Sequence, residues 1–185
     1  MVIISGPSTV GKNPFIYKAC KMFGLDYITP VTTREIRPDE KNGIDYWFFS
    51  KDIFQSKIKN GIITEWDYCL GNYYGYEFPF PGSGAFITHG LSRMALRIKA
   101  KYPKEITTVF LMPNSVDEIL ENIKKIYSGN TLVLREELVK EEICHAVLFD
   151  NVFIKDGPVS ELLNRSDIIQ LLKAESECST KGTSH

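Results

Sequence analysis

The residues with the clearest chemical meaning lie near the N-terminus, where an apolar run leads directly into a glycine-rich turn. Residues 2–5 have the composition of a buried strand, and the next seven read Gly-Pro-Ser-Thr-Val-Gly-Lys. In a turn of this type the backbone N–H groups and the start of the following helix surround a phosphate, and Lys12 reaches the β- and γ-phosphates. A purely structural turn is the alternative. The pattern predicts an ATP-binding P-loop made of Gly6, Pro7, Ser8, Thr9, Val10, Gly11, Lys12 and Asn13.

Two residues at the end of this turn depart from the usual pattern. The residue after the lysine is normally Ser or Thr, whose hydroxyl binds Mg²⁺, whereas this chain has Asn13 with a longer amide. Pro14 has no backbone N–H, so one donor to the phosphates is absent, although proline is well tolerated in the first turn of a helix. We therefore expect Mg²⁺ to accompany ATP in a weakened site, and we assign no residue as a metal ligand.

Alternating strands and helices are expected to hold this turn in place. Apolar runs predict buried strands at 2–5, 27–31, 85–88, 107–112 and 152–154, and amphipathic patterns predict helices at 13–23, 50–60, 92–101, 134–148 and 160–174, with another opened by a capping box at Ser115. This alternation predicts an α/β fold in which helices flank a parallel sheet. Residues 32–80 break the alternation with aromatic segments and a hairpin turn at Gly71, which predicts a small mixed-β insert. The polar stretch 175–185 has no periodicity and is expected to be disordered.

Composition argues against several classes of function. The chain has 185 residues, 43% of them hydrophobic and 24% charged, as expected for one soluble domain. Its 22 basic and 23 acidic residues nearly cancel and form no block of like charge, so neither nucleic acid nor a membrane surface is expected as a partner. The four cysteines are widely spaced and predict free thiols, and the short apolar start is unlike a signal peptide, so we expect a cytoplasmic protein.

A second set of motifs lies within the predicted insert. Residues 32–46 read TTREIRPDEKNGIDY, residues 64–66 read TEW and residues 71–75 read GNYYG. Together with the P-loop and a stretch ending at Phe149-Asp150, these motifs resemble the guanylate kinase family, in the same order and over nearly the whole chain to about residue 170. The resemblance implies one P-loop kinase domain over residues 1–174, with a nucleoside-monophosphate-binding insert at about 32–80 and a short lid at about 124–136.

The resemblance also implies which residues bind the acceptor nucleotide. Arg34, Arg37, Tyr46 and Tyr74 match the residues that hold the phosphate of GMP, and Glu65 matches the carboxylate that accepts from guanine. Guanidinium and phenol groups converging on one point suit a phosphate dianion, because charge-assisted hydrogen bonds are strong. Solvent-exposed arginines and a surface glutamate are the alternatives.

Other guanine contacts of the family are missing. The family serine ahead of the TTR motif falls on Pro30, and the hydroxyl residue after YYG falls on Tyr76. The acidic strand end falls near residues 88–91, where His89 is either a replacement ligand or a structural residue. The segment between Tyr76 and Ala85 is also shorter than in the family.

The lid keeps part of its positive charge. Arg135 matches the second lid arginine, which supplies charge at the transition state, whereas the first falls in a stretch that contains Lys124 and Lys125 but no arginine. A lysine supplies charge without the planar fork of a guanidinium.

Two classes of function fit these residues. The first is a guanylate kinase that transfers the γ-phosphoryl group of MgATP to GMP, with Lys12, Arg34 and Arg135 as catalytic residues. The second is a catalytically inactive module that binds a nucleotide or a phosphorylated partner protein. The presence of Lys12 favours the enzyme, while the altered metal, guanine and lid positions predict weakened activity. The altered guanine positions also leave open a related kinase that acts on another monophosphate.

Overall fold

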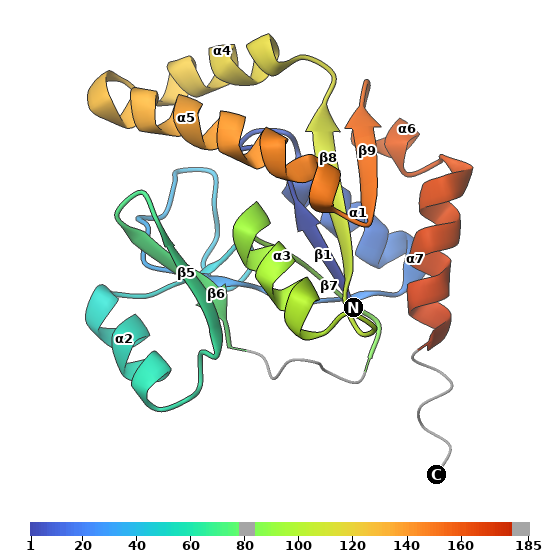
Figure 1. Ribbon diagram of the computed structural model, residues 1–185, viewed down its shortest axis with the longest axis horizontal. Helices are drawn as coiled ribbons and strands as arrows, with labels where there is room; N and C mark the ends of the chain where they lie inside the picture. Colours follow the sequence, from blue (N-terminus) through green and yellow to red (C-terminus); the bar gives the residue numbers. More distant parts are fainter. Residues whose placement is uncertain (78–83, 179–185) are drawn as a thin grey trace.

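A five-stranded parallel sheet forms the centre of the protein. We describe residues 1–77 and 84–178 from a computed structural model, shown in Figure 1. The strands lie in the order β2 (Asp26–Tyr27), β7 (Phe86–His89), β1 (Val2–Ser5), β8 (Thr107–Pro113) and β9 (Asn151–Lys155). Their P-loop kinase arrangement is the α/β fold that the sequence predicts.

Helices cover both faces of this sheet. They are α1 (Lys12–Phe23), α3 (Ser92–Lys101), α4 (Val116–Ile126), α5 (Gly129–His145), α6 (Val159–Leu162) and α7 (Ser166–Cys178). Val2 and Ile4 pack in one core cluster with α1, α6 and α7, whereas Ile3 packs in a second cluster with α3. A strand buried on both faces needs a continuous apolar run, which explains the composition of residues 2–5.

A second, smaller sheet lies beside the first (Figure 1). Its strands lie in the order β4 (Trp47–Phe48), β3 (Val31–Thr32), β6 (Asn72–Tyr76) and β5 (Glu65–Cys69), and α2 (Lys51–Lys59) packs on it. The β3–β4 pair is parallel and the other pairs are antiparallel, so the sheet is mixed as the sequence predicts. Ser50, the first residue of the helix expected at 50–60, is the N-cap of α2, and its hydroxyl accepts from the backbone N–H of Ile53.

Several boundaries differ from the sequence prediction. The strand expected at 27–31 is two strands, β2 in the large sheet and β3 in the small one, because the chain crosses between the sheets at this point. The helix expected at 160–174 is divided into α6 and α7, and the helix expected from residue 134 already begins at Gly129. No helix within the described parts of the chain is long and apolar enough to cross a membrane.

The expected disordered tail is wrong for its first four residues. Helix α7 continues to Cys178, because contacts of the Glu175 side chain anchor its last turns. Its carboxylate binds the N-terminal ammonium group of Met1 at 2.8 Å and accepts a hydrogen bond from the Thr107 hydroxyl. The rest of the expected tail, residues 179–185, lies outside the described residues.

Candidate active site

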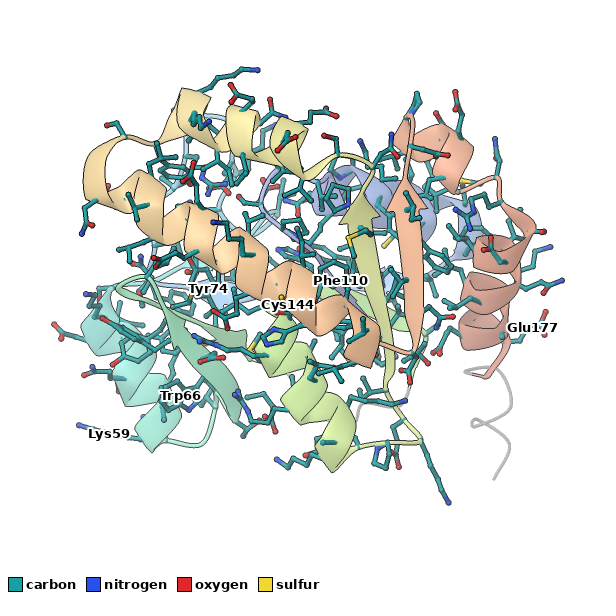
Figure 2. All side chains as sticks on the ribbon, turned by 45° about the horizontal axis from the view of Figure 1, so that its top comes forward. Lys59, Trp66, Tyr74, Phe110, Cys144 and Glu177 are labelled. Carbon is teal, nitrogen blue, oxygen red and sulfur yellow. The ribbon has the colours of Figure 1, made fainter. Side chains whose placement is uncertain are left out.

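A cavity of about 670 Å³ lies where the two sheets and α5 meet. One wall is the turn between β1 and α1, a second is the loop between β3 and β4, and a third is α5. Tyr74 in β6 reaches this space from the small sheet, on the side that faces α5 (Figure 2). The cavity therefore brings together residues that are more than 100 positions apart in the chain.

The glycine-rich turn forms the first wall. Ser8, Thr9, Gly11, Lys12 and Asn13 line the cavity, and the three remaining residues of the predicted P-loop, Gly6, Pro7 and Val10, are buried behind it. Gly6 has a φ of 146°, and a Cβ there would lie 2.5 Å from the backbone oxygen of Leu111, so this close approach to β8 requires glycine.

Lys12 lies across the turn that precedes it. Its ammonium group donates to the backbone oxygens of Gly6 at 2.6 Å and Pro7 at 3.0 Å. Burial lowers the pKa of Lys12, and the nearby Glu142 carboxylate opposes this effect. The turn thus holds the Lys12 ammonium group against its own backbone oxygens, at the wall of the cavity.

Asn13 joins the turn to the opposite wall. Its Nδ2 donates to the Asp45 carboxylate at 2.7 Å, and the Tyr17 hydroxyl donates to the same oxygen at 3.0 Å. The residue in the usual metal-binding position is therefore engaged by the loop that carries the arginines. Asp45 is a site residue that the sequence analysis did not select.

The second wall carries the predicted acceptor residues. Arg34 donates to the Glu40 carboxylate at 2.6 Å, and its guanidinium lies 5.6 Å from the ring centres of Tyr46 and Phe48. Burial raises the pKa of both Tyr46 and Tyr74, so at neutral pH their hydroxyls are protonated donors. Arg34, Tyr46 and Tyr74, which are predicted to hold the acceptor phosphate, all line the cavity.

Tyr127 links the arginines of the second and third walls. Arg37 donates to its hydroxyl, and the Arg135 guanidinium lies 4.7 Å from the centre of its ring. Arg135 also makes a side-chain hydrogen bond with Tyr74, while its buried Nε has no hydrogen-bond partner among the described residues. A donor left without a partner in a buried position is costly, so this group is suited to an added anionic ligand.

The predicted lid at about 124–136 consists mostly of helix. Residues 124–136 comprise the end of α4, the turn at residues 127–128 and the first half of α5. Lys124 binds Glu121 at 2.8 Å and Lys125 binds Asn122 at 3.1 Å, both on the exposed surface of α4. Of the lid residues, Ile126 and Arg135 line the cavity and these two lysines do not.

Among the predicted acceptor residues, Glu65 is the one that the structure does not bring to the cavity. Its side chain is 6% exposed and its carboxylate forms an ion pair with Lys101 at 2.6 Å. It lines a separate depression together with Asp67 and Arg97. The β5 register points Glu65 toward α3, and this long-range contact has no signal in the local motif.

Two further cavity residues were missed or left open by the sequence analysis. Glu142 in α5 is 5% exposed, accepts from the backbone N–H of Ser92, and has its pKa raised by burial to about 7. His89 is buried beside Tyr27, whose hydroxyl lies 3.0 Å from Nδ1, and burial lowers the pKa of His89 to about 3. The available signal for Glu142 was a carboxylate on the buried face of a helix, three residues after Val139.

Comparison with known proteins identifies relatives of this chain. A protein-family model described as guanylate kinase matches residues 1–79. The guanylate kinase of Chlorobium luteolum is 31% identical over 165 residues, which cover 84% of this chain and 83% of that protein. The guanylate kinase of Mycoplasma genitalium is 33% identical over 150 residues, and the chain spans 62% of its length.

A solved structure is also similar to this chain in its fold. The crystal structure of guanylate kinase from Anaplasma phagocytophilum matches with a TM-score of 0.75 at 22% identity, over 97% of this chain and 88% of that chain. This match establishes the shared fold, and the sequence relatives establish the kinship. The chain belongs to the guanylate kinase family.

Proposed function

We propose that this protein is a nucleoside monophosphate kinase of the guanylate kinase type, which transfers the γ-phosphoryl group of ATP to GMP in the cytoplasm and releases ADP and GDP. The observation that supports it best is that Lys12 of the phosphate-binding turn and the arginines Arg34 and Arg37 line one cavity. A donor nucleotide and an acceptor phosphate bound at these two walls would face each other.

In this proposal each wall has a separate task. The backbone N–H groups of the turn and Lys12 bind the phosphates of ATP. Arg34 and Arg37, with the hydroxyls of Tyr46 and Tyr74, hold the acceptor phosphate. Arg135 brings positive charge to the transferring group from α5. Phosphoryl transfer depends mainly on positioning and on stabilising the charge of the phosphoryl oxygens, so such an arrangement suffices without a covalent intermediate.

The residues present fit a Mg²⁺ ion that arrives with ATP. Asn13 carries an amide oxygen, and its Nδ2 donates to the Asp45 carboxylate beside the turn. Mg²⁺ prefers amide and carboxylate oxygens as ligands, along with nucleotide phosphates and water. No cluster of three or more His, Cys, Asp or Glu side chains suited to a metal occurs in the described parts of the chain. Asn13 and Asp45 would hold the ion, which would supply positive charge to the phosphates of ATP.

An assay of ADP release with MgATP and GMP tests this proposal directly. GMP-dependent ADP formation that is lost in Lys12→Ala supports it, and Lys18→Ala, an exposed lysine on the same helix, is the matched control. Calorimetric titration of GMP separates the two classes of function. Binding of GMP without ADP release would contradict the enzyme and favour the binding module, and no binding at millimolar GMP would contradict the acceptor site itself.

A further inference from the structure

We propose that the acceptor site of this protein recognises the 5′-phosphate of a nucleoside monophosphate without reading guanine, so that GMP, AMP, CMP and UMP are comparable acceptors. This inference rests on the proposed function and narrows it. It follows from the contacts at Glu65, Tyr76 and Gly90, three positions that lie in the segments where the resemblance expects guanine recognition.

The first position is Glu65, whose carboxylate is already neutralised. Lys101 binds it at 2.6 Å, and one turn earlier on α3 Arg97 lies 3.7 Å from Asp67, two residues along β5. Arg93 continues the row and binds Asp67 at 2.8 Å. A basic face of α3 thus pairs with the alternate acidic residues of β5, which directs the Glu65 carboxylate toward the helix and away from the cavity.

The second and third positions are Tyr76 and Gly90, and the Tyr76 side chain fills the space next to Gly90. The Tyr76 ring is fully buried, and its hydroxyl donates to the backbone oxygen of His89 at 2.9 Å. A Cβ at Gly90 would lie 2.3 Å from that hydroxyl oxygen. A carboxylate therefore cannot be accommodated at position 90 while Tyr76 is present, and the tyrosine itself has no exposed surface with which to contact a base.

Of the four carboxylates that line the cavity among the described residues, three are bound by other groups. Glu40 binds Arg34, and Asp45 accepts from Asn13 and Tyr17. Glu142 accepts from the backbone N–H of Ser92, and its main charged neighbour is Lys12 of the phosphate-binding turn. Asp39 is exposed on the loop at the mouth of the cavity. Residues 78–83 read FPFPGS and carry no carboxylate.

The cavity also has apolar lining residues, which pack against any planar ring. Cys69, Leu91 and Leu138 line the cavity beyond the phosphate-binding residues. Apolar contacts of this kind discriminate weakly, whereas a site built to hydrogen-bond a substrate rejects the wrong one by a factor of about 10⁴ or more. The phosphate-binding residues are present, so affinity is kept while discrimination among bases is lost.

An acceptor panel tests the inference. ADP release is measured with MgATP and GMP, AMP, CMP or UMP, and kcat/KM is expected to vary by less than about tenfold among them. A preference for GMP of more than about 100-fold would overturn the inference and leave the proposed function standing. If no acceptor gives ADP, the proposed function fails by itself. Calorimetry then decides the inference: equal affinity for GMP and ribose 5-phosphate supports it, and tighter binding of GMP by about 100-fold, or no binding of either, overturns it.

Variants test the three positions. Lys101→Ala releases Glu65 and is expected to raise the ratio of kcat/KM for GMP over AMP several-fold, whereas Lys104→Ala, an exposed lysine just beyond α3, leaves it unchanged. Adding Tyr76→Ser and Gly90→Asp is expected to raise the ratio by about tenfold or more. The single Lys101→Ala variant keeps the test informative if the triple variant does not fold. An unchanged ratio in the folded variants would overturn the assignment of these residues.

Discussion

At the scale of single residues, Glu142 places an ionisable group in the wall of the cavity. Burial raises its pKa to about 7, above the value of about 4.3 in an unfolded chain. A raised pKa of this sign means that stability from this group is fully present below about pH 4 and is lost as the pH rises through 7. At alkaline pH Glu142 is ionised in its buried position, which lowers the free energy of unfolding.

We therefore expect Glu142→Gln to stabilise the protein more at pH 8 than at pH 5, with a difference in the free energy of unfolding on the order of 2 kcal/mol. Glutamine keeps an oxygen that accepts from Ser92 and removes the buried charge. Denaturant unfolding at the two pH values measures this difference. Glu141→Gln, an exposed neighbour, is the control. An equal effect of Glu142→Gln at both pH values would show that the carboxyl group does not titrate in this range.

Asn13 and Pro14 give a second prediction at this scale. The double change Asn13→Ser and Pro14→Thr supplies a hydroxyl for Mg²⁺ and a backbone N–H for the phosphates, and we expect kcat to rise by about tenfold or more. It also removes the Asn13–Asp45 hydrogen bond, which is expected to cost about 1 kcal/mol of stability. Steady-state rates and denaturant unfolding measure both effects, with Pro14→Thr as the control. An unchanged rate would indicate that the lid, and not these two positions, limits the activity.

Residues of the site differ in how far the sequence could predict them. Lys12, Arg34 and Tyr46 belong to compact motifs, and the structure brings them to one cavity because each motif is positioned by a short local turn or strand. Glu65 also lies in a motif, but a contact with Lys101, 36 residues away, determines where it points. Asp45 and Glu142 belong to the site because of their contacts with residues on other elements. Spacing along the chain does not reveal such contacts.

At the scale of elements, long and uninterrupted patterns were predicted well. The strand at β8 and the helix at α3 have the expected positions because β8 buries a continuous apolar run and α3 buries one apolar face. The short strands β2 and β3 were merged into one, since periodicity over five residues does not say that the chain changes sheets. Helix α7 was predicted too short because its last turn depends on the ion pair between Glu175 and Met1.

The contact between β6 and the end of β7 allows a sharp test of packing. Gly90→Ala places a Cβ 2.3 Å from the Tyr76 hydroxyl, and we expect it to destabilise the protein by about 1–3 kcal/mol. In Gly90→Ala with Tyr76→Phe the hydroxyl is gone, and the nearest ring atom is 3.5 Å from the Cβ. The double variant should therefore be more stable than the sum of the single effects. Additive free energies in this double-mutant cycle would mean that the two positions do not compete for space.

Helix α5 carries Arg135, the lid arginine that lines the cavity. The charge and the planar shape of the Arg135 side chain can be tested separately. Arg135→Ala is expected to lower kcat on the order of 10³-fold, and Arg135→Lys by less because it keeps the charge without the planar fork. KM for GMP should also rise, since Arg135 binds Tyr74. Lys124→Ala, on the exposed face of α4, is the control and should leave both constants unchanged. Loss of activity in Lys124→Ala would instead place a second cation in the site.

At the scale of the whole molecule, the two sheets divide the work of the cavity. The donor wall belongs to the large sheet, through the turn after β1, and the acceptor wall belongs to the small sheet and its loop. Direct bonds join them at Asn13–Asp45 and along the row of ion pairs between α3 and β5. Each wall nevertheless has its own phosphate-binding residues, so two ligands bound to separate walls should stabilise the protein through separate residues.

This division predicts which variants lose which ligand. A ligand that binds only the folded state adds about 1.4 kcal/mol of stability when its concentration is ten times its Kd. In thermal unfolding, ATP and GMP should each raise the Tm of the unaltered protein. The variant Arg34→Ala with Arg37→Ala should lose the shift with GMP and keep the shift with ATP, because its changes lie on the acceptor wall. Lys12→Ala should show the reverse pattern. Loss of both shifts in either variant would contradict independent walls and indicate that one ligand must bind before the other.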